Sequence, residues 1–124
     1  MLGLASGSAL AQSPRSTLER TVLGGTRANV SSHFLMLPDC TSGGDVAARV
    51  TKAPKHGDVV IEPAAVVASY EKDTSFAQCN AKSVPGIKIY YKANENYQGA
   101  DGFEVLIFYP NGTTRENRYV ITVK

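Results

Sequence analysis

The sequence lacks the long apolar runs of membrane-spanning proteins and the basic clusters of nucleic-acid-binding proteins. No stretch contains 18 or more consecutive apolar residues, so the sequence predicts no membrane-spanning helix. Lysine and arginine are scattered, no aromatic residues are interleaved with a basic run, and the formal net charge is only +2. We therefore expect no nucleic-acid partner.

The common signatures of catalysis are also missing. The sequence contains no Gly-x-Ser-x-Gly elbow, no His-Glu-x-x-His zinc motif and no glycine-rich phosphate loop. Its acidic residues fall mostly in expected turns or at positions expected to face solvent. The sequence thus predicts a protein without enzymatic activity and without a cofactor.

Metal ligands are scarce, because the chain has only two histidines, His33 and His56. A copper or zinc site would need further ligands such as Met36 or Cys40. His33 and Met36 are three residues apart, which places them on opposite faces of a strand. We expect no metal site, and we assign His56 to packing or capping at the turn before Gly57.

The first 11 residues carry no charge and consist mainly of leucine, alanine, glycine and serine. Ala9-Leu10-Ala11 followed by Gln12 fits the small-x-small cleavage rule of secretory signal peptides. The sequence therefore predicts a signal-peptide remnant over 1–11, the alternative being an apolar tail. A flexible polar leader is expected over 12–19, and one domain over 20–124.

Two cysteines, Cys40 and Cys79, bear on the compartment. In an exported chain an even number of cysteines favours a disulfide, whereas two separate buried thiols would suit a cytosolic protein. A Cys40–Cys79 bond would close a loop of about 40 residues and stabilise the fold by about 3–4 kcal/mol. Together with the N-terminal pattern, this predicts a secreted or periplasmic bacterial protein.

Alternation of apolar and polar residues predicts an all-β fold. The strands are expected over 30–37, 46–51, 59–61, 87–92, 103–109 and 119–124. Residues 64–70 fit either a helical turn or a strand, and 72–86 form a polar, irregular segment that the disulfide would pin. No window shows convincing helical periodicity, and short strands separated by turn signals indicate a sandwich or barrel.

Three motifs follow one another in the second half of the chain. They are Pro54-Lys55-His56-Gly57-Asp58-Val59, the segment Tyr91-Lys92-Ala93-Asn94-Glu95-Asn96-Tyr97-Gln98-Gly99-Ala100-Asp101-Gly102-Phe103, and Val120-Ile121-Thr122-Val123. Over residues 46–124 this succession resembles the bacterial Ig-like and cadherin-like repeats of large surface adhesins. The resemblance implies a Greek-key sandwich of about seven strands that acts as an adhesive or spacer module.

The resemblance also implies that the motif residues serve the fold. Structural roles in turns and core are expected for His56, Gly57, Tyr97, Gly99, Asp101 and Phe103. The Asp-rich calcium motifs of true cadherins are absent, and Asp101 alone cannot hold Ca²⁺, which takes six to eight oxygen ligands.

Three function hypotheses follow from these observations. In the first, an exported, non-enzymatic Ig-like module binds a protein or glycan. Its binding surface would be the 64–86 segment or an outward stripe of Tyr90, Leu106 and Phe108 on neighbouring strands, unless 64–86 covers that stripe. In the second, a periplasmic inhibitor or chaperone-like protein caps an enzyme or a strand edge. The third is a metal or small-ligand carrier.

Overall fold

The computed structural model describes residues 14–124, which contain seven strands, one short 3-10 helix and no α-helix. The predicted signal-peptide remnant over 1–11 lies outside the described residues. The elements are β1 (Arg15–Val22), β2 (Ala28–His33), β3 (Ala47–Lys52), β4 (Gly57–Val67), η2 (Ala77–Cys79), β5 (Ser83–Ala93), β6 (Gly99–Phe108) and β7 (Thr114–Val123).

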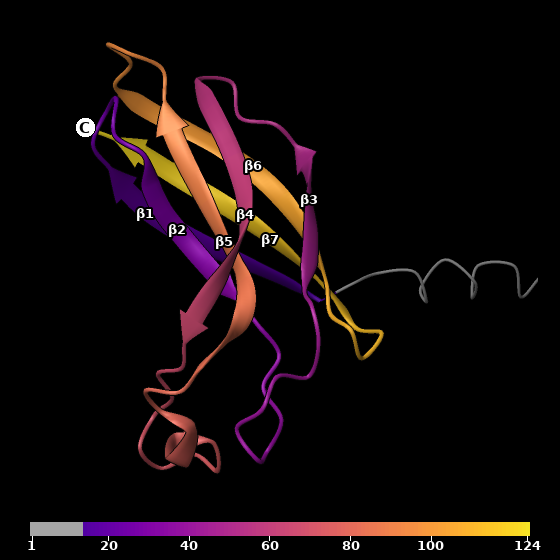
Figure 1. Cartoon of the computed structure of the whole chain (residues 1–124). Helices are drawn as coiled ribbons and strands as arrows, with labels where there is room; N and C mark the ends of the chain where they lie inside the picture. Colours follow the sequence, from indigo (N-terminus) through magenta and orange to yellow (C-terminus); the bar gives the residue numbers. More distant parts are fainter. Residues whose placement is uncertain (1–13) are drawn as a thin grey trace, which may run out of the picture.

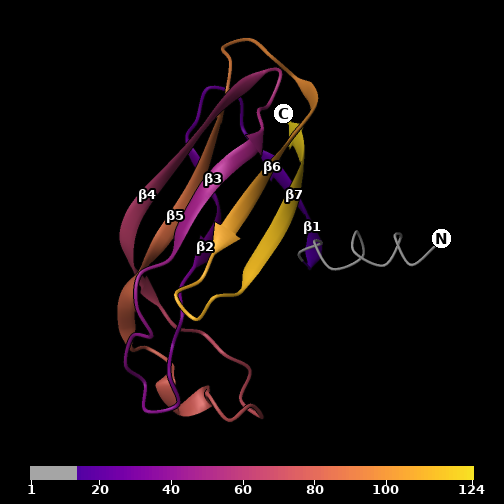
Figure 2. The ribbon, with the colours of Figure 1, turned by 90° about the vertical axis from the view of Figure 1, so that its right-hand side faces the viewer.

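The strands form two sheets that face each other (Figures 1 and 2). One sheet has four strands in the order β1-β7-β6-β3, and the other has three in the order β2-β5-β4. The neighbours pair antiparallel except for β1, which runs parallel to β7. The predicted all-β, sandwich-like architecture is confirmed.

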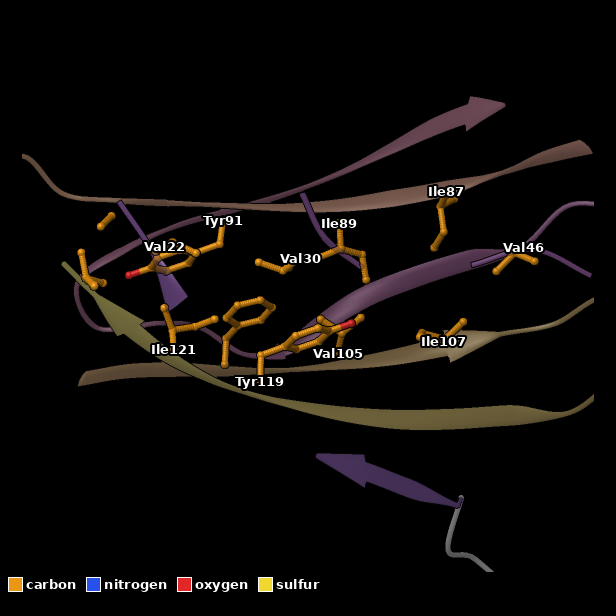
Figure 3. Close-up of a cluster of buried hydrophobic side chains, with 13 residues drawn as sticks. Val22, Val30, Val46, Ile87, Ile89, Tyr91, Val105, Ile107, Tyr119 and Ile121 are labelled. Carbon is orange, nitrogen blue, oxygen red and sulfur yellow. The ribbon is translucent and has the colours of Figure 1, made fainter. Parts of the chain in front are cut away.

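The main core lies between the sheets and follows the expected alternation of the strands (Figure 3). Its centre is a stack of aromatic rings, with centroid distances of 5.9 Å from Tyr91 to Phe103 and 4.4 Å from Phe103 to Tyr119. The buried residues of this cluster are Val22, Val30, Val46, Ile87, Ile89, Tyr91, Ala93, Phe103, Val105, Ile107, Tyr119, Ile121 and Val123.

A second, smaller core lies where two long connections meet at one end of the sandwich (Figure 1). The β2–β3 connection and the β4–β5 connection contribute to it, and we call residues 34–44 and 68–82 together the end lobe. The buried members of this core are Met36, Ala68, Cys79 and Val84, and the partly buried ones are Phe34, Cys40, Tyr70 and Phe76.

The domain begins earlier than residue 20, the start predicted from the sequence. Residues from Arg15 onward belong to β1, so the flexible leader expected over 12–19 is wrong for its last five positions. The strand signal is weak because β1 is an edge strand with mostly exposed side chains, of which only Val22 is fully buried. Main-chain pairing with β7 holds it in the sheet, and only Val22 and Leu18 add contacts with the main core.

Other predicted ranges also need correction. β5 begins at Ser83, so the last four residues of the irregular segment expected over 72–86 are strand, and β6 and β7 begin earlier than the strands expected from 103 and 119. The strand expected over 30–37 ends at His33, because Phe34 and Met36 pack into the end lobe instead of continuing the sheet. The strand expected over 59–61 extends from Gly57 to Val67 and passes through Pro63. Proline lacks an N–H donor, but β4 is an edge strand, where that loss is tolerated. Residues 64–67 are therefore strand.

Gly57 gives a test of the close packing where β4 begins beside β5. A Cβ atom at this position would lie 2.6 Å from the carbonyl oxygen of Lys92 and 2.8 Å from the ring of Tyr91. We expect Gly57→Ala to lower the free energy of unfolding by about 1–3 kcal/mol, because neither neighbour can yield without distorting β5. Urea unfolding of the variant checks this, and an unchanged midpoint would contradict it.

Candidate functional site

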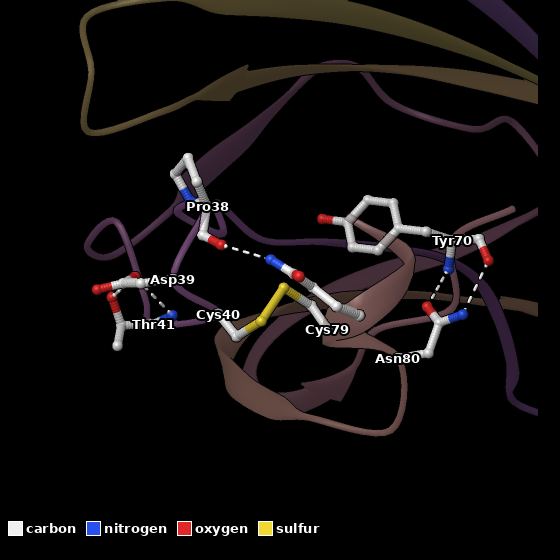
Figure 4. Close-up of a disulfide and its surroundings, with 8 residues drawn as sticks. Pro38, Asp39, Cys40, Thr41, Tyr70, Cys79 and Asn80 are labelled. Carbon is white, nitrogen blue, oxygen red and sulfur yellow. Dashed lines mark hydrogen bonds between the residues drawn. A yellow bond between two sulfur atoms is a disulfide. The ribbon is translucent and has the colours of Figure 1, made fainter. Parts of the chain in front are cut away.

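A disulfide joins the two connections that make up the end lobe (Figure 4). Cys40 of the β2–β3 connection bonds to Cys79 of η2, with a Cα–Cα distance of 5.2 Å, which confirms the predicted pairing. The Gln78 carboxamide adds a second link by donating a hydrogen bond of 3.1 Å to the carbonyl oxygen of Pro38. The lobe is therefore tied across its middle by one covalent and one polar contact.

Within the end lobe, Tyr70 is held by two hydrogen bonds to its backbone and by contacts with two aromatic rings (Figure 4). Its backbone N–H donates to the Asn80 Oδ1 atom at 2.6 Å, and the Asn80 Nδ2 atom donates to the Tyr70 carbonyl oxygen at 3.0 Å. Its ring meets Phe34 edge to face at a centroid distance of 6.2 Å and Phe76 at 5.2 Å. A partly exposed aromatic ring is thus held in one place.

Tyr70 borders a hollow of about 410 Å³ that extends over β2, β4 and β5, which we call the face hollow. Its lining residues are Asn29, Ser32, Phe34, Ala65, Val66, Val67, Ser69, Tyr70 and Lys88. Lys88 alternates with the buried residues Ile87 and Ile89, so it projects from the outer side of the three-stranded sheet. The Asn29 Nδ2 atom donates to the Ser32 hydroxyl at 3.3 Å.

The residues Tyr90, Leu106 and Phe108 do not form the single stripe that the sequence predicts. Tyr90 lies on β5 of the three-stranded sheet, whereas Leu106 and Phe108 lie on β6 of the four-stranded sheet. All three alternate with buried neighbours, so they project from opposite outer faces. The prediction fails because the chain crosses between the sheets after β5.

Arginine side chains cover the outward aromatic rings on both faces. The Arg27 guanidinium lies 3.7 Å from the centroid of the Tyr90 ring, and Arg27 also pairs with Glu62. On the opposite face, the Arg49 guanidinium lies 5.6 Å from the centroid of the Phe108 ring. These rings are therefore less open to a ligand than their outward direction suggests.

Asp101 joins three segments at the end of the sandwich opposite to the end lobe. Its carboxylate accepts hydrogen bonds from the Tyr91 hydroxyl at 2.6 Å and from the backbone N–H groups of Lys55 at 3.0 Å, His56 at 3.1 Å and Gly102 at 2.9 Å. Burial raises the pKa of Asp101, but these four donors outweigh that effect and leave the pKa below its ordinary value. Asp101 is thus a structural acceptor, as the motif implies.

The other motif residues also contact the fold. The His56 ring stacks on Tyr97 at a centroid distance of 4.0 Å, and the Tyr97 hydroxyl donates to the Ala100 carbonyl oxygen. Gly99 has a φ of +127°, which other residues rarely adopt, and Phe103 is 1% exposed. Tyr97 is only partly buried at its corner.

A polar cluster inside the sandwich was not foreseen from the sequence. The Ser31 Oγ atom lies 2.6 Å from the Tyr119 hydroxyl and 3.0 Å from the His33 Nε2 atom, and the Asn117 Nδ2 atom donates to the same tyrosine hydroxyl at 3.1 Å. Burial, together with the charge of Arg115, lowers the pKa of His33 to about 4. The imidazole is therefore neutral near neutral pH. The one sign of this cluster in the sequence is that Asn117 lies two residues before Tyr119, which places both on the same side of β7.

Other possible sites offer less organised chemistry. Within residues 14–124 no three side chains are grouped as metal ligands. A hollow of about 290 Å³ over Gly102 is bordered by Lys52, Lys55 and Arg118. Another, of about 690 Å³, is lined mostly by small residues such as Pro63, Ala65 and Pro85. The second hollow has no aromatic residue in its lining, and the Phe103 and Tyr119 rings beside the first are buried in the main core.

In the described part of the chain, no helix has the length and apolar character needed to cross a membrane. Comparison with known proteins finds no matching family model, no matching curated protein and no matching solved structure.

Removing the disulfide tests how far the end lobe depends on it. We expect the double variant Cys40→Ser, Cys79→Ser to lose about 3–4 kcal/mol of unfolding free energy, because the cross-link restricts the unfolded chain. Hydrogen exchange should show the largest loss of amide protection within 34–44 and 68–82, with the central strands less affected. Thiol titration of the unsubstituted protein, denatured without a reducing agent, should find no free thiol; free thiols would contradict the bond itself.

His33 predicts a loss of stability in mild acid. Its pKa is about 4 in the folded protein, whereas an ordinary histidine has a pKa of 6.5, so the unfolded chain binds more protons between these values. Stability should fall as the pH drops from about 6.5 to 4, by about 2 kcal/mol once partial exposure is allowed for. Urea unfolding across this range checks it, and His33→Gln, which keeps a polar partner for Ser31, should flatten the dependence. An equally steep dependence in that variant would contradict the assignment.

Proposed function

We propose that this protein is an exported Ig-like domain, without enzymatic activity, that binds a protein or glycan through its end lobe and the adjoining face hollow. The observation that carries this proposal is the disulfide-tied lobe that fixes Tyr70 beside the hollow. The buried lobe residues belong to a separate small core rather than to the main one. Long irregular connections in compact domains are usually functional, and here they are also cross-linked to each other.

The strand arrangement supports the Ig-like part of the proposal. A three-stranded and a four-stranded sheet, with successive strands passing between them, is the architecture of seven-stranded Ig domains. The residues of the adhesin-like motif occupy structural positions. Asp101 accepts a hydrogen bond from the His56 backbone in the β3–β4 turn, and Gly57 is the first residue of β4. These contacts suit a motif that serves the fold.

The disulfide supports export to the periplasm or the cell exterior. Disulfides persist in oxidising compartments and are rare in the cytosol. The predicted cleavage after Ala11 falls ahead of β1, so a mature chain would keep all seven strands. In an exported protein, the end lobe would stay cross-linked, because the Cys40–Cys79 disulfide is stable in an oxidising compartment.

The alternative role, capping an enzyme or a strand edge, has less support because three of the four edge strands, β2, β3 and β4, carry features that hinder strand addition. β4 contains Pro63, and register shifts interrupt β2 between Asn29 and Ser31 and β3 between Val50 and Lys52. Prolines and bulges at edges oppose pairing with another strand. Binding through the lobe and the face is therefore preferred.

A binding panel of immobilised glycans and extracellular proteins tests the proposal. Tyr70→Ala should weaken the strongest interaction at least about tenfold, because it removes an anchoring ring next to the hollow. Phe108→Ala is the matched control, since it removes a ring from the opposite face. Surface plasmon resonance gives the affinities.

Thermal unfolding must show that both variants remain folded at the assay temperature. The proposal is contradicted if Phe108→Ala abolishes binding while Tyr70→Ala leaves it intact, or if the panel yields no ligand.

A further inference from the structure

The face hollow has one charged group. Among its lining residues only Lys88 carries a charge. Glu62 pairs with Lys88 in the strand register but forms its ion pair with Arg27. The ion pairs within residues 14–124 are Arg15–Glu116 and Arg27–Glu62, so the Lys88 ammonium has no carboxylate partner in this part of the chain. A ligand with one carboxylate would complement the hollow.

The remaining polar groups of the hollow suit hydroxyl groups. Ser32 and Ser69 offer hydroxyls that both donate and accept, and Asn29 offers a carboxamide. The contact with Ser32 uses one Asn29 N–H, so the carboxamide oxygen and the second N–H remain for a ligand. These groups come from β2 and from the end lobe, on either side of the hollow.

The aromatic wall suits a ring with an apolar face. Tyr70 and Phe34 form that wall; the bonds to Asn80 fix the Tyr70 backbone, and contacts with Phe34 and Phe76 position its ring. A volume of about 410 Å³ falls within the range of small-ligand sites, which combine apolar walls with a few placed polar groups.

We propose that the face hollow binds an acidic sugar unit of a glycan, of the uronate class. The Lys88 ammonium takes the carboxylate, Asn29 and Ser32 bind sugar hydroxyls, and the Tyr70 ring packs against the apolar face of the sugar. This inference rests on the proposed binding function and narrows its ligand class.

An acidic peptide fits the hollow less well than an acidic sugar. An extended peptide binds a sheet mainly through main-chain hydrogen bonds. β5, which carries Lys88, pairs with β2 on one side and β4 on the other, so its main-chain groups are already used. The polar groups of the face hollow are side chains, which can form hydrogen bonds with the hydroxyl groups of a sugar.

Titration of the protein with short uronate oligomers tests the inference. The probes are oligomers of galacturonate, mannuronate and glucuronate, with methyl-esterified galacturonate as the uncharged match and oligoglutamate as the acidic peptide. At least one uronate should bind in calorimetry, and backbone NMR shifts should concentrate at 29–32, 69–70 and 88. Lys88→Met should weaken that binding about tenfold or more, because it removes a charge-assisted contact.

Lys92→Met is the matched control. Lys92 lies on the same strand and the same face as Lys88 but outside the lining of the hollow. It should leave the affinity unchanged, and the ester and oligoglutamate should bind at least about tenfold more weakly than the uronate. Equal effects of the two lysine variants, equal binding of the ester, tighter binding of oligoglutamate, or no binding of any uronate would each overturn the inference.

These outcomes are separable from failure of the proposed function. If another ligand from the panel depends on Tyr70 but not on Lys88, the ligand class assigned here is wrong while the lobe remains the binding site. If no ligand depends on Tyr70, the proposed function itself fails.

Discussion

The Cys40–Cys79 bond is the constraint on which the organisation of this molecule's lobe end depends. The two connections that it joins contain only one short 3-10 helix and a small buried core. Ordering so many residues outside regular strands costs conformational entropy that such a core offsets poorly. The cross-link lowers that cost by restricting the unfolded chain, and Asn80 then positions Tyr70 locally. The proposed binding surface would thus be arranged before a ligand arrives, which favours affinity.

The opposite end of the sandwich is held by different chemistry. There, one carboxylate, Asp101, gathers donors from the β3–β4 turn, from β5 and from β6. Its lowered pKa means that the carboxylate keeps its charge, and with it these bonds, to a lower pH than an ordinary aspartate would. Between the two ends, the interior cluster around Ser31 and His33 responds to milder acid. The molecule therefore combines a redox-dependent end with an acid-sensitive interior.

The sequence predicts the central strands well because their two sides meet different environments. Val105, Ile107 and Ile121 are fully buried while their neighbours reach solvent, so the period of two is visible in the residues. The edges are predicted poorly, since β1 has little apolar face and Pro63 imitates a strand end within β4. The cysteine pairing was accessible because the chain has only two cysteines.

The candidate site was harder to foresee, for a physical reason. Asn29, Ser32 and Lys88 become neighbours only because β2 pairs with β5, a non-local contact that no short motif encodes. The outward directions of Tyr90 and Phe108 followed from alternation, but their assignment to different sheets depends on a crossover that alternation cannot reveal. The signal-peptide remnant over 1–11 and the adhesin resemblance stay predictions.

The parallel pairing of β1 with β7 bears on how the domain responds to mechanical load. Because the two strands run in the same direction, the start of β1 and the end of β7 lie at opposite ends of the sheet (Figure 1). Tension applied between those points acts along the ladder from Arg15–Glu116 to Val22–Val123 and loads its hydrogen bonds in shear, so that they must break together rather than one by one. A domain built in this way resists being pulled apart lengthwise.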